Sequence, residues 1–575
     1  MIAFLLYHLI KRLQYPWMST GELTRCLSII DETHILGDIV MTFLTILQLI
    51  INVLVVGVLL FGIITAIAFY FKDKTQKHHS VLRNYPLLAR VRYFLEKIGP
   101  EMRQYLFSED TQGKPFSRSD YKNIVIAGKY NSRMSSYGTL YPYEDGFFIQ
   151  NAMYPKQESE LNVDQSHMIS TFIYKIKNER LFNRDEKIHK TEIDPFYLAD
   201  DDAIVLGSHL QHPFTIKRLV GQSGMSYGAL GGRAITALSM GLGQAGTWMN
   251  TGEGGLSKYH LEGGADIIFQ IGPGMFGVRN KEGDFDLDMF LKQARREKVR
   301  AFEVKLAQGA KTRGGHMEGN KVTEEIAEIR NVEPWKTINS PNRFAHINNN
   351  KELLSWVKKL ETHGQKPVGF KIVVSRVHEI EALVKTMVET DTYPSFITVD
   401  GGEGGTGATF QELQDGVGLP LFTALPIVSA MLEKYGVRDK VKIFASGKLV
   451  TPDKIAIALG LGADLINVAR GMMINVGCIM SQQCHMNTCP VGVATTDPKR
   501  ERALIVDEKK YRVTNYITSL HEGLFTIAAA VGVSSPTQIT RDHIILKRKD
   551  GSLQTIHDYK LKLTETALKG QSDSA

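Results

Sequence analysis

The longest apolar run of the chain lies close to the N-terminus. Residues 39–71 contain no charged residue and are dominated by Leu, Ile, Val and Phe. About 20 apolar residues are enough to cross a bilayer, so the run predicts a transmembrane helix at residues 39–71, preceded by a leader at residues 1–38. A buried core helix is the alternative. The run is too long for a signal peptide and lacks a small-residue cleavage site at its end.

The charges on either side of this run predict its orientation. Asp31 and Asp38 precede the run, whereas Lys72 and Lys74 follow it. By the positive-inside rule the part of the chain after the helix lies in the cytoplasm. We therefore expect a single-pass protein of the cell membrane with a cytoplasmic catalytic part. Met41 opens the run and is a second candidate for the start of translation.

Two further patterns divide the rest of the chain. Residues 72–213 show short helical patterns and aromatic loops without a motif that indicates chemistry, and we expect a cap or membrane-proximal region there. Beyond it, short apolar strands end in glycine-rich turns and alternate with helical segments, which is typical of a parallel α/β architecture. The predicted strands are residues 216–221, 247–251, 267–271, 302–306, 368–374, 396–399, 441–444 and 465–468.

Eight strands are the number that a closed (β/α)8 TIM-type barrel requires. The prediction is therefore a barrel at residues 214–535, followed by a C-terminal tail at residues 536–575. A doubly wound open sheet is the alternative.

Composition and charge are those of a large globular protein. Of the 575 residues, 43% are hydrophobic and 22% are charged, so a packed core is expected and extended disorder is not. The formal net charge is +7, but the basic residues are scattered and no motif combines them with aromatic residues. We therefore expect no nucleic-acid partner.

Three of the four cysteines, Cys478, Cys484 and Cys489, fall close together, and a proline follows the last. Such a cluster in a large chain indicates metal or redox chemistry in a reducing compartment rather than disulfides. Zinc sites favour closer cysteine pairs and four-iron clusters take four cysteines, so the trio favours a 3Fe-4S cluster. Zinc with His485 as a fourth ligand and inert buried thiols are the alternatives. Cys26 lies far away and is expected to be a bystander.

Glycine-rich or polar loops follow nearly every predicted strand. They read GMSYGA at 224–229, NTGEGG at 250–255, QIGPG at 270–274, DGGEGGTGA at 400–408, ASGK at 445–448 and ARG at 469–471. Active sites of such barrels lie at the C-terminal ends of the strands, and the last two loops commonly hold a phosphate. Glycine lets backbone N–H groups approach a planar or anionic ligand. FMN is therefore the expected cofactor.

Two further motifs are KLAQGAK at 305–311 and GCIMSQQCHMNTCPVGVAT at 477–495. Together with the loops above, they resemble the central FMN-binding domain of ferredoxin-dependent and NADPH-dependent glutamate synthases. The resemblance covers roughly residues 200–500. It implies a barrel that binds FMN beside a 3Fe-4S cluster. It also implies an oxidoreductase that reduces the imine of 2-oxoglutarate and ammonia to glutamate.

The resemblance also implies roles for individual residues. Cys478, Cys484 and Cys489 would bind the cluster, Glu253 would guide the addition of ammonia, and three further residues would hold the carboxylates of 2-oxoglutarate. Those three are Gln308, Lys311 and Arg330. The residues expected to bind FMN are Met225, Ser226, Asn250, Thr251, Gln270, Lys305, Lys371, Asp400, Gly401, Gly402, Ser446, Gly447 and Gly471.

Some positions depart from the family's pattern. His316 stands where a glutamine is expected and Leu256 where a second acidic residue is expected, so a related oxo acid is an alternative substrate. We expect no glutaminase domain in this polypeptide, and free ammonia, an amine or a partner protein is expected to supply nitrogen. No Rossmann-type GxGxxG unit follows a strand and opens a helix, so the expected electron donor is a ferredoxin-like protein or a separate reductase.

Two other functions remain alternatives. The first is a membrane-associated electron-transfer subunit that holds a flavin and an iron–sulfur cluster but no organic substrate. The second, a barrel isomerase or hydroxy-acid oxidase, leaves the cysteines unexplained.

Overall fold

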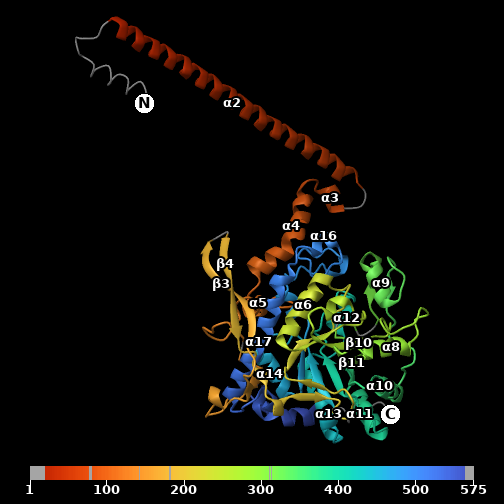
Figure 1. Cartoon of the computed structure of the whole chain (residues 1–575). Helices are drawn as coiled ribbons and strands as arrows, with labels where there is room; N and C mark the ends of the chain where they lie inside the picture. Colours follow the sequence, from red (N-terminus) through yellow and green to blue (C-terminus); the bar gives the residue numbers. More distant parts are fainter. Residues whose placement is uncertain are drawn as a thin grey trace. The chain divides into compact units, whose positions relative to one another are not determined.

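The computed structural model describes residues 20–76, 80–141, 143–180, 183–309, 311 and 314–563. The chain forms two compact units, Met1–Ser108 and Glu109–Ala575 (Figure 1). Residues 1–19 of the predicted leader and residues 564–575 of the predicted tail lie outside the described residues. The predicted domain boundaries stay predictions.

The first unit contains one very long helix, α2 (Thr20–Thr75), followed by the short α3 (Ser80–Asn84). Helix α4 (Leu88–Met102) then runs into the π-helical turn η1 (Arg103–Phe107). Within α2, Met41–Thr75 is strongly apolar, and an 18-residue window in it has a mean hydropathy of 2.8 and no buried residue. This segment has the length and composition of a membrane-spanning helix.

The second unit is built around a closed barrel of eight parallel strands, so the predicted barrel is confirmed. Its strands are β8 (Val220–Gln222), β9 (Trp248–Asn250), β10 (Asp266–Ile271), β11 (Val299–Lys305), β14 (Val368–Ile372), β15 (Phe396–Asp400), β16 (Lys442–Ser446) and β17 (Leu465–Val468). They pair in this order, and β17 closes the barrel on β8. Most of their residues are buried because helices cover the outside and side chains fill the inside.

The first predicted strand, residues 216–221, is displaced in the structure. Ile216 ends β7 (Phe214–Ile216), which pairs with β6 (Ile204–Leu206) in an antiparallel hairpin outside the barrel. Between β7 and β8, the fully buried Arg218 donates hydrogen bonds to the carbonyls of Pro195 and Ala245. The barrel strand therefore begins only at Val220.

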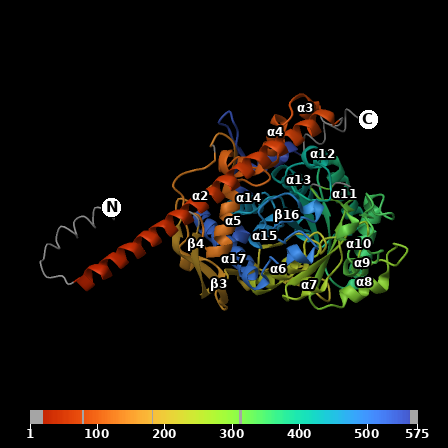
Figure 2. The same cartoon turned by 90° about the horizontal axis from the view of Figure 1, so that it is seen from above.

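Helices surround the strands, as Figure 2 shows. They are α6 (Gly232–Ala245), α7 (Lys258–Leu261), α8 (Leu287–Ala294), α9 (Glu324–Arg330), α10 (Asn350–Gly364), α11 (Val377–Glu389), α12 (Gln411–Gly416), α13 (Leu421–Lys434), α14 (Pro452–Gly460), α15 (Arg470–Asn475), α16 (Pro498–Glu501) and α17 (Val506–Val531). Side chains of Asp286, Thr323 and Asn349 cap α8, α9 and α10 and satisfy N–H groups that a helix start leaves free.

The remaining elements pack around this core. Helix α5 (Arg118–Tyr130) lies against α17, and the long hairpin of β3 (Ile169–Arg180) and β4 (Asn183–Ile193) lies beside it. Near the C-terminus, β18 (Ile544–Lys547) pairs with β1 (Gly146–Ile149) and with β19 (Leu553–Thr555). Two small pairs complete the unit, β2 (Val163–Asp164) with β5 (Tyr197–Leu198) and β12 (His316–Met317) with β13 (Ile338–Asn339).

Candidate active site

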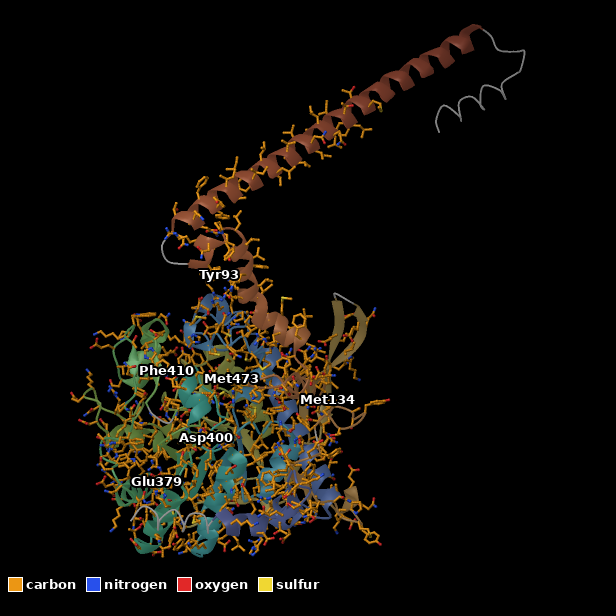
Figure 3. All side chains as sticks on the ribbon, turned by 180° about the vertical axis from the view of Figure 1, so that it is seen from behind. Tyr93, Met134, Glu379, Asp400, Phe410 and Met473 are labelled. Carbon is orange, nitrogen blue, oxygen red and sulfur yellow. The ribbon has the colours of Figure 1, made fainter. Side chains whose placement is uncertain are left out.

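Most of the predicted site residues lie at the C-terminal ends of the barrel strands. At the first three strands, Met225 and Ser226 follow β8, Asn250 ends β9 before Thr251 and Glu253, and Gln270 lies on β10. At the next two, Lys305 ends β11 before Gln308 and Lys311, and Lys371 lies on β14. At the last three, Asp400 ends β15 before Gly401 and Gly402, Ser446 ends β16 before Gly447, and Gly471 lies in α15 after β17. Figure 3 shows Asp400 inside the barrel region. Arg330 ends α9, and the cysteines follow α15.

A carboxylate and two ammonium groups meet above β9 and β11. The carboxylate of Glu253 forms ion pairs with Lys311 and, at 3.4 Å, with the ammonium of Lys305. The ammonium of Lys305 also donates to Oε1 of Gln308 at 2.9 Å. Both lysines are almost completely buried. Burial, and after it the charge of Lys371, lowers the pKa of Lys305 to about 7. Lys305 can therefore exchange a proton near neutral pH.

Arg330 supplies a further buried cation next to this cluster. Its Nη2 donates to the carbonyl of Tyr227 at 3.1 Å, while its buried Nε has no hydrogen-bond partner among the described residues. A Cβ at Gly254 would lie 2.8 Å from Arg330 Nη2, so the loop after β9 touches the guanidinium closely. Burial lowers the pKa of Lys311, and the positive charge of Arg330 lowers it further. The two groups thus form a cationic site that suits an anionic ligand.

His316, the position that departs from the family's pattern, does not join this cluster. Its imidazole is half exposed and bonds to Asn339 and Glu318. The residues that the structure does bring together are Glu253, Lys305, Gln308 and Lys311.

A buried glutamate that sequence analysis missed organises the barrel interior. Glu303, on β11, is 1% exposed and accepts hydrogen bonds from three strands. The donors are Asn250 Nδ2 at 2.9 Å, Gln270 Nε2 at 2.6 Å and Thr398 Oγ1 at 2.5 Å. These bonds fix the orientation of two amides expected to bind FMN. A Cβ at Gly224 would lie about 3 Å from both amides, so the loop after β8 approaches them closely.

Asp400 connects two of the loops. Its Oδ2 accepts from the backbone N–H of Gly309 at 2.7 Å and lies 3.6 Å from the ammonium of Lys371. Asp400 and Lys371 are both almost completely buried. The aspartate therefore holds the lysine-bearing loop after β11 against the end of β15.

Gln222, at the end of β8, is the second residue that sequence analysis missed. It is fully buried, and neither amide atom has a hydrogen-bond partner among the described residues. Leaving a buried polar group unpaired costs about 1–3 kcal/mol, so this amide is poised to bind a ligand. A heterocycle that carries both donors and acceptors, as the flavin ring does, fits this requirement. A glutamine that ends an apolar strand was the available signal.

The loops after β16 and β17 offer a site for an anion. The carboxylate of Glu403 accepts from the backbone N–H of Leu421 at 3.0 Å and lies against Gly447, where a Cβ would be 2.8 Å from it. Burial raises the pKa of Glu403. Lys448 and Arg470 stand nearby, and each lies over the ring of Phe116. Two cations thus lie near this turn, and their positive charge suits a phosphate.

The three cysteines come together after α15. Burial, and then the neighbouring thiols of Cys484 and Cys489, contribute to raising the pKa of Cys478 to about 11. No group of three or more His, Cys, Asp or Glu among the described residues is arranged to hold a metal ion. The buried Lys321 donates to the carbonyl of Cys484 at 3.1 Å.

Comparison with known proteins reveals clear similarities. A family model described as a conserved region in glutamate synthase matches residues 157–534. The chain is 55% identical over 505 residues to the glutamate synthase large subunit-like protein YerD of Bacillus subtilis (strain 168), covering 87% of this chain and 96% of that protein. It is 30% identical over 380 residues to an archaeal-type glutamate synthase (NADPH) of Thermotoga maritima, covering 66% and 70%.

Among solved structures, a mutant flavocytochrome b2 with pyruvate bound matches 78% of this chain and 91% of its own at 14% identity. Its TM-score is 0.39, which is too low to bear on function.

Proposed function

The chain belongs to the glutamate synthase family of oxidoreductases, which act on the CH–NH2 group of amino-acid donors, and we propose that it makes glutamate or a close relative by reducing an imine. The imine forms from 2-oxoglutarate, or a related oxo acid, and ammonia or an amine. The observation that carries this proposal is the buried cluster in which Glu253 meets Lys305 and Lys311 beside Gln308.

The cations of the cluster suit a dicarboxylate substrate. Lys311 and Arg330 are both about 95% buried, so a carboxylate that reaches them leaves water and is held by charge-assisted hydrogen bonds. The unpartnered Nε of Arg330 is a donor that such a ligand would satisfy. Gln308, bonded to Lys305, would orient the same ligand at its other side.

Glu253 and Lys305 would manage protons during the addition of ammonia. Attack by ammonia on the oxo carbon and loss of water from the adduct require both a proton acceptor and a proton donor. A carboxylate 3.4 Å from an ammonium whose pKa is about 7 supports both tasks near neutral pH. Reduction of the imine then consumes two electrons and two protons.

FMN and a 3Fe-4S cluster are the proposed cofactors. FMN would supply the hydride equivalent and the cluster would supply single electrons. Gln222, Asn250, Gln270 and Lys371 would hold the flavin ring, and the turn at Gly447 would hold its phosphate. Cys478, Cys484 and Cys489 would bind the cluster, with Lys321 compensating its negative charge.

The electrons would come from a ferredoxin-like protein or a separate reductase. The apolar segment Met41–Thr75 supports attachment to the cell membrane by a single span, with the second unit in the cytoplasm.

The test is incorporation of labelled nitrogen. The photoreduced, detergent-solubilised full chain is supplied with 2-oxoglutarate and 15N-ammonium, and 15N-glutamate is measured by mass spectrometry. Glu253→Gln is expected to abolish the product while FMN content stays unchanged. If the native protein binds FMN and the cluster but labels no oxo acid from a panel of dicarboxylates, an electron-transfer role replaces this proposal.

A further inference from the structure

Helix α4 of the first unit presents an apolar face that none of the unit's described residues covers. Residues spaced three and four apart lie on one side of a helix. We call the following set the apolar stripe: Leu88, Val91, Phe94, Leu95, Ile98 and Met102. Its first four members are each more than half exposed. The π-helical turn η1 continues this character with Leu106 and Phe107, which are 68% and 71% exposed.

The other sides of α4 carry charges of both signs. Arg90, Arg92 and Lys97 lie there with Glu96 and Glu101, and Arg103 follows at the end of the helix. Arg90 and Arg92 form ion pairs with Asp73 and Glu96, so Lys97 and Arg103 are the basic side chains that would meet anionic lipid head groups. A helix with a broad apolar face and basic residues beside it is typical of segments that lie in the plane of a membrane surface.

The start of α4 is fixed to the end of the apolar segment Met41–Thr75. The guanidinium of Arg90 holds the carboxylate of Asp73 with two hydrogen bonds, of 2.9 Å and 2.6 Å. The same carboxylate accepts from the backbone N–H of Leu87 at 3.2 Å. Arg90 also lies over the ring of Phe69, 4.1 Å from its centre. Asp73 is 1% exposed, so this is a buried, bidentate contact between the two helices.

This contact determines where α4 begins relative to a bilayer. If Met41–Thr75 spans the membrane, Asp73 and the adjacent Lys72 and Lys74 mark the level of the head groups. Helix α4 then starts at that level, and it does not continue the direction of α2, because the chain turns sharply between them (Figure 1). Figure 3 marks Tyr93, which lies on α4.

We propose that α4 and η1 lie in the head-group layer of an anionic membrane, with the apolar stripe against the acyl chains. The occupant of the stripe is thus the lipid surface that surrounds the span. This inference rests on the proposed membrane span and adds a second, in-plane attachment to it.

Site-specific photo-crosslinking of the full chain tests the proposal. The protein is reconstituted in nanodiscs of phosphatidylethanolamine and phosphatidylglycerol, with p-benzoylphenylalanine placed at one position at a time. Phe94 probes the stripe, and Leu95 is a second position there in case the first variant fails to fold. Glu96, half exposed on the far side of the helix, is the matched control, and Phe61 reports on the span.

We expect Phe94 to crosslink to lipid at least fivefold more than Glu96, with Phe61 also crosslinking to lipid. Three results overturn the inference: equal lipid yields at Phe94 and Glu96, crosslinks from Phe94 to residues 109–575, and crosslinks to a second copy of the chain. If Phe61 itself fails to reach lipid, the span is wrong and the in-plane attachment falls with it. A lipid signal at Phe61 alone leaves the span intact and refutes only the stripe.

Discussion

Replacing Lys311 by alanine is expected to weaken the binding of 2-oxoglutarate. Lys311 is 5% exposed and lies close to Glu253 and Arg330. In this position its ammonium would donate a charged hydrogen bond to the proposed ligand. A hydrogen bond to a charged group contributes about 1.5–3 kcal/mol. The expected increase in Kd is therefore about 10-fold to 150-fold. The lower part of this range is favoured, because in the free protein Lys311 already pairs with Glu253.

The assay is a titration of the oxidised protein with 2-oxoglutarate, followed by the change in flavin absorbance or by equilibrium dialysis. Lys336→Ala is the matched control, since Lys336 is also a lysine of this loop region but is 71% exposed and pairs with the exposed Glu333. Flavin content and thermal unfolding show that each variant is folded. An unchanged Kd in Lys311→Ala, with normal flavin content, would refute the assignment of Lys311 to substrate binding.

Three further predictions concern the cofactors and the fold. Cys489→Ser is expected to lose most of its iron and the EPR signal of the oxidised cluster while keeping FMN; full iron content would contradict the ligand assignment. Gln222→Leu is expected to raise the Kd for FMN several-fold, measured by flavin release on dilution, and unchanged retention would mean that the buried amide is not a flavin ligand. Burial alone would raise the pKa of Glu508, but the hydrogen bond from Tyr174 and the charges beside it lower it from 4.5 to about 2. Its contribution to stability is thus complete above about pH 4.5 and is lost as the pH falls toward 2. Tyr174→Phe should flatten the fall in the urea midpoint between pH 5 and pH 3, whereas parallel curves would show that the bond is unimportant.

The barrel strands could be predicted from the sequence because strands covered on both faces are continuous apolar runs with glycine-rich ends. The first barrel strand begins later than predicted, at Val220, because Arg218 separates it from the hairpin strand that ends at Ile216. The buried bonds of Arg218 to Pro195 and Ala245 are tertiary contacts that no local pattern shows.

The candidate site likewise contains residues that the sequence predicts and residues that it does not. Glu253 and Lys311 lie in motifs, and their positions at strand ends already indicated that they meet. Glu303 instead acts through Asn250, Gln270 and Thr398, which reach it from other strands and are distant in sequence. Such roles depend on the register between strands, which a single sequence does not specify.

The most direct test of imine reduction is anaerobic reoxidation of the photoreduced, detergent-solubilised protein, followed at the flavin absorbance band. Reaction with 2-oxoglutarate plus ammonium is compared with buffer alone and with each substrate separately. We expect rapid reoxidation only when both substrates are present, with glutamate formed in proportion to the electrons consumed. Reoxidation no faster than in buffer, from protein that contains both flavin and cluster, would contradict it.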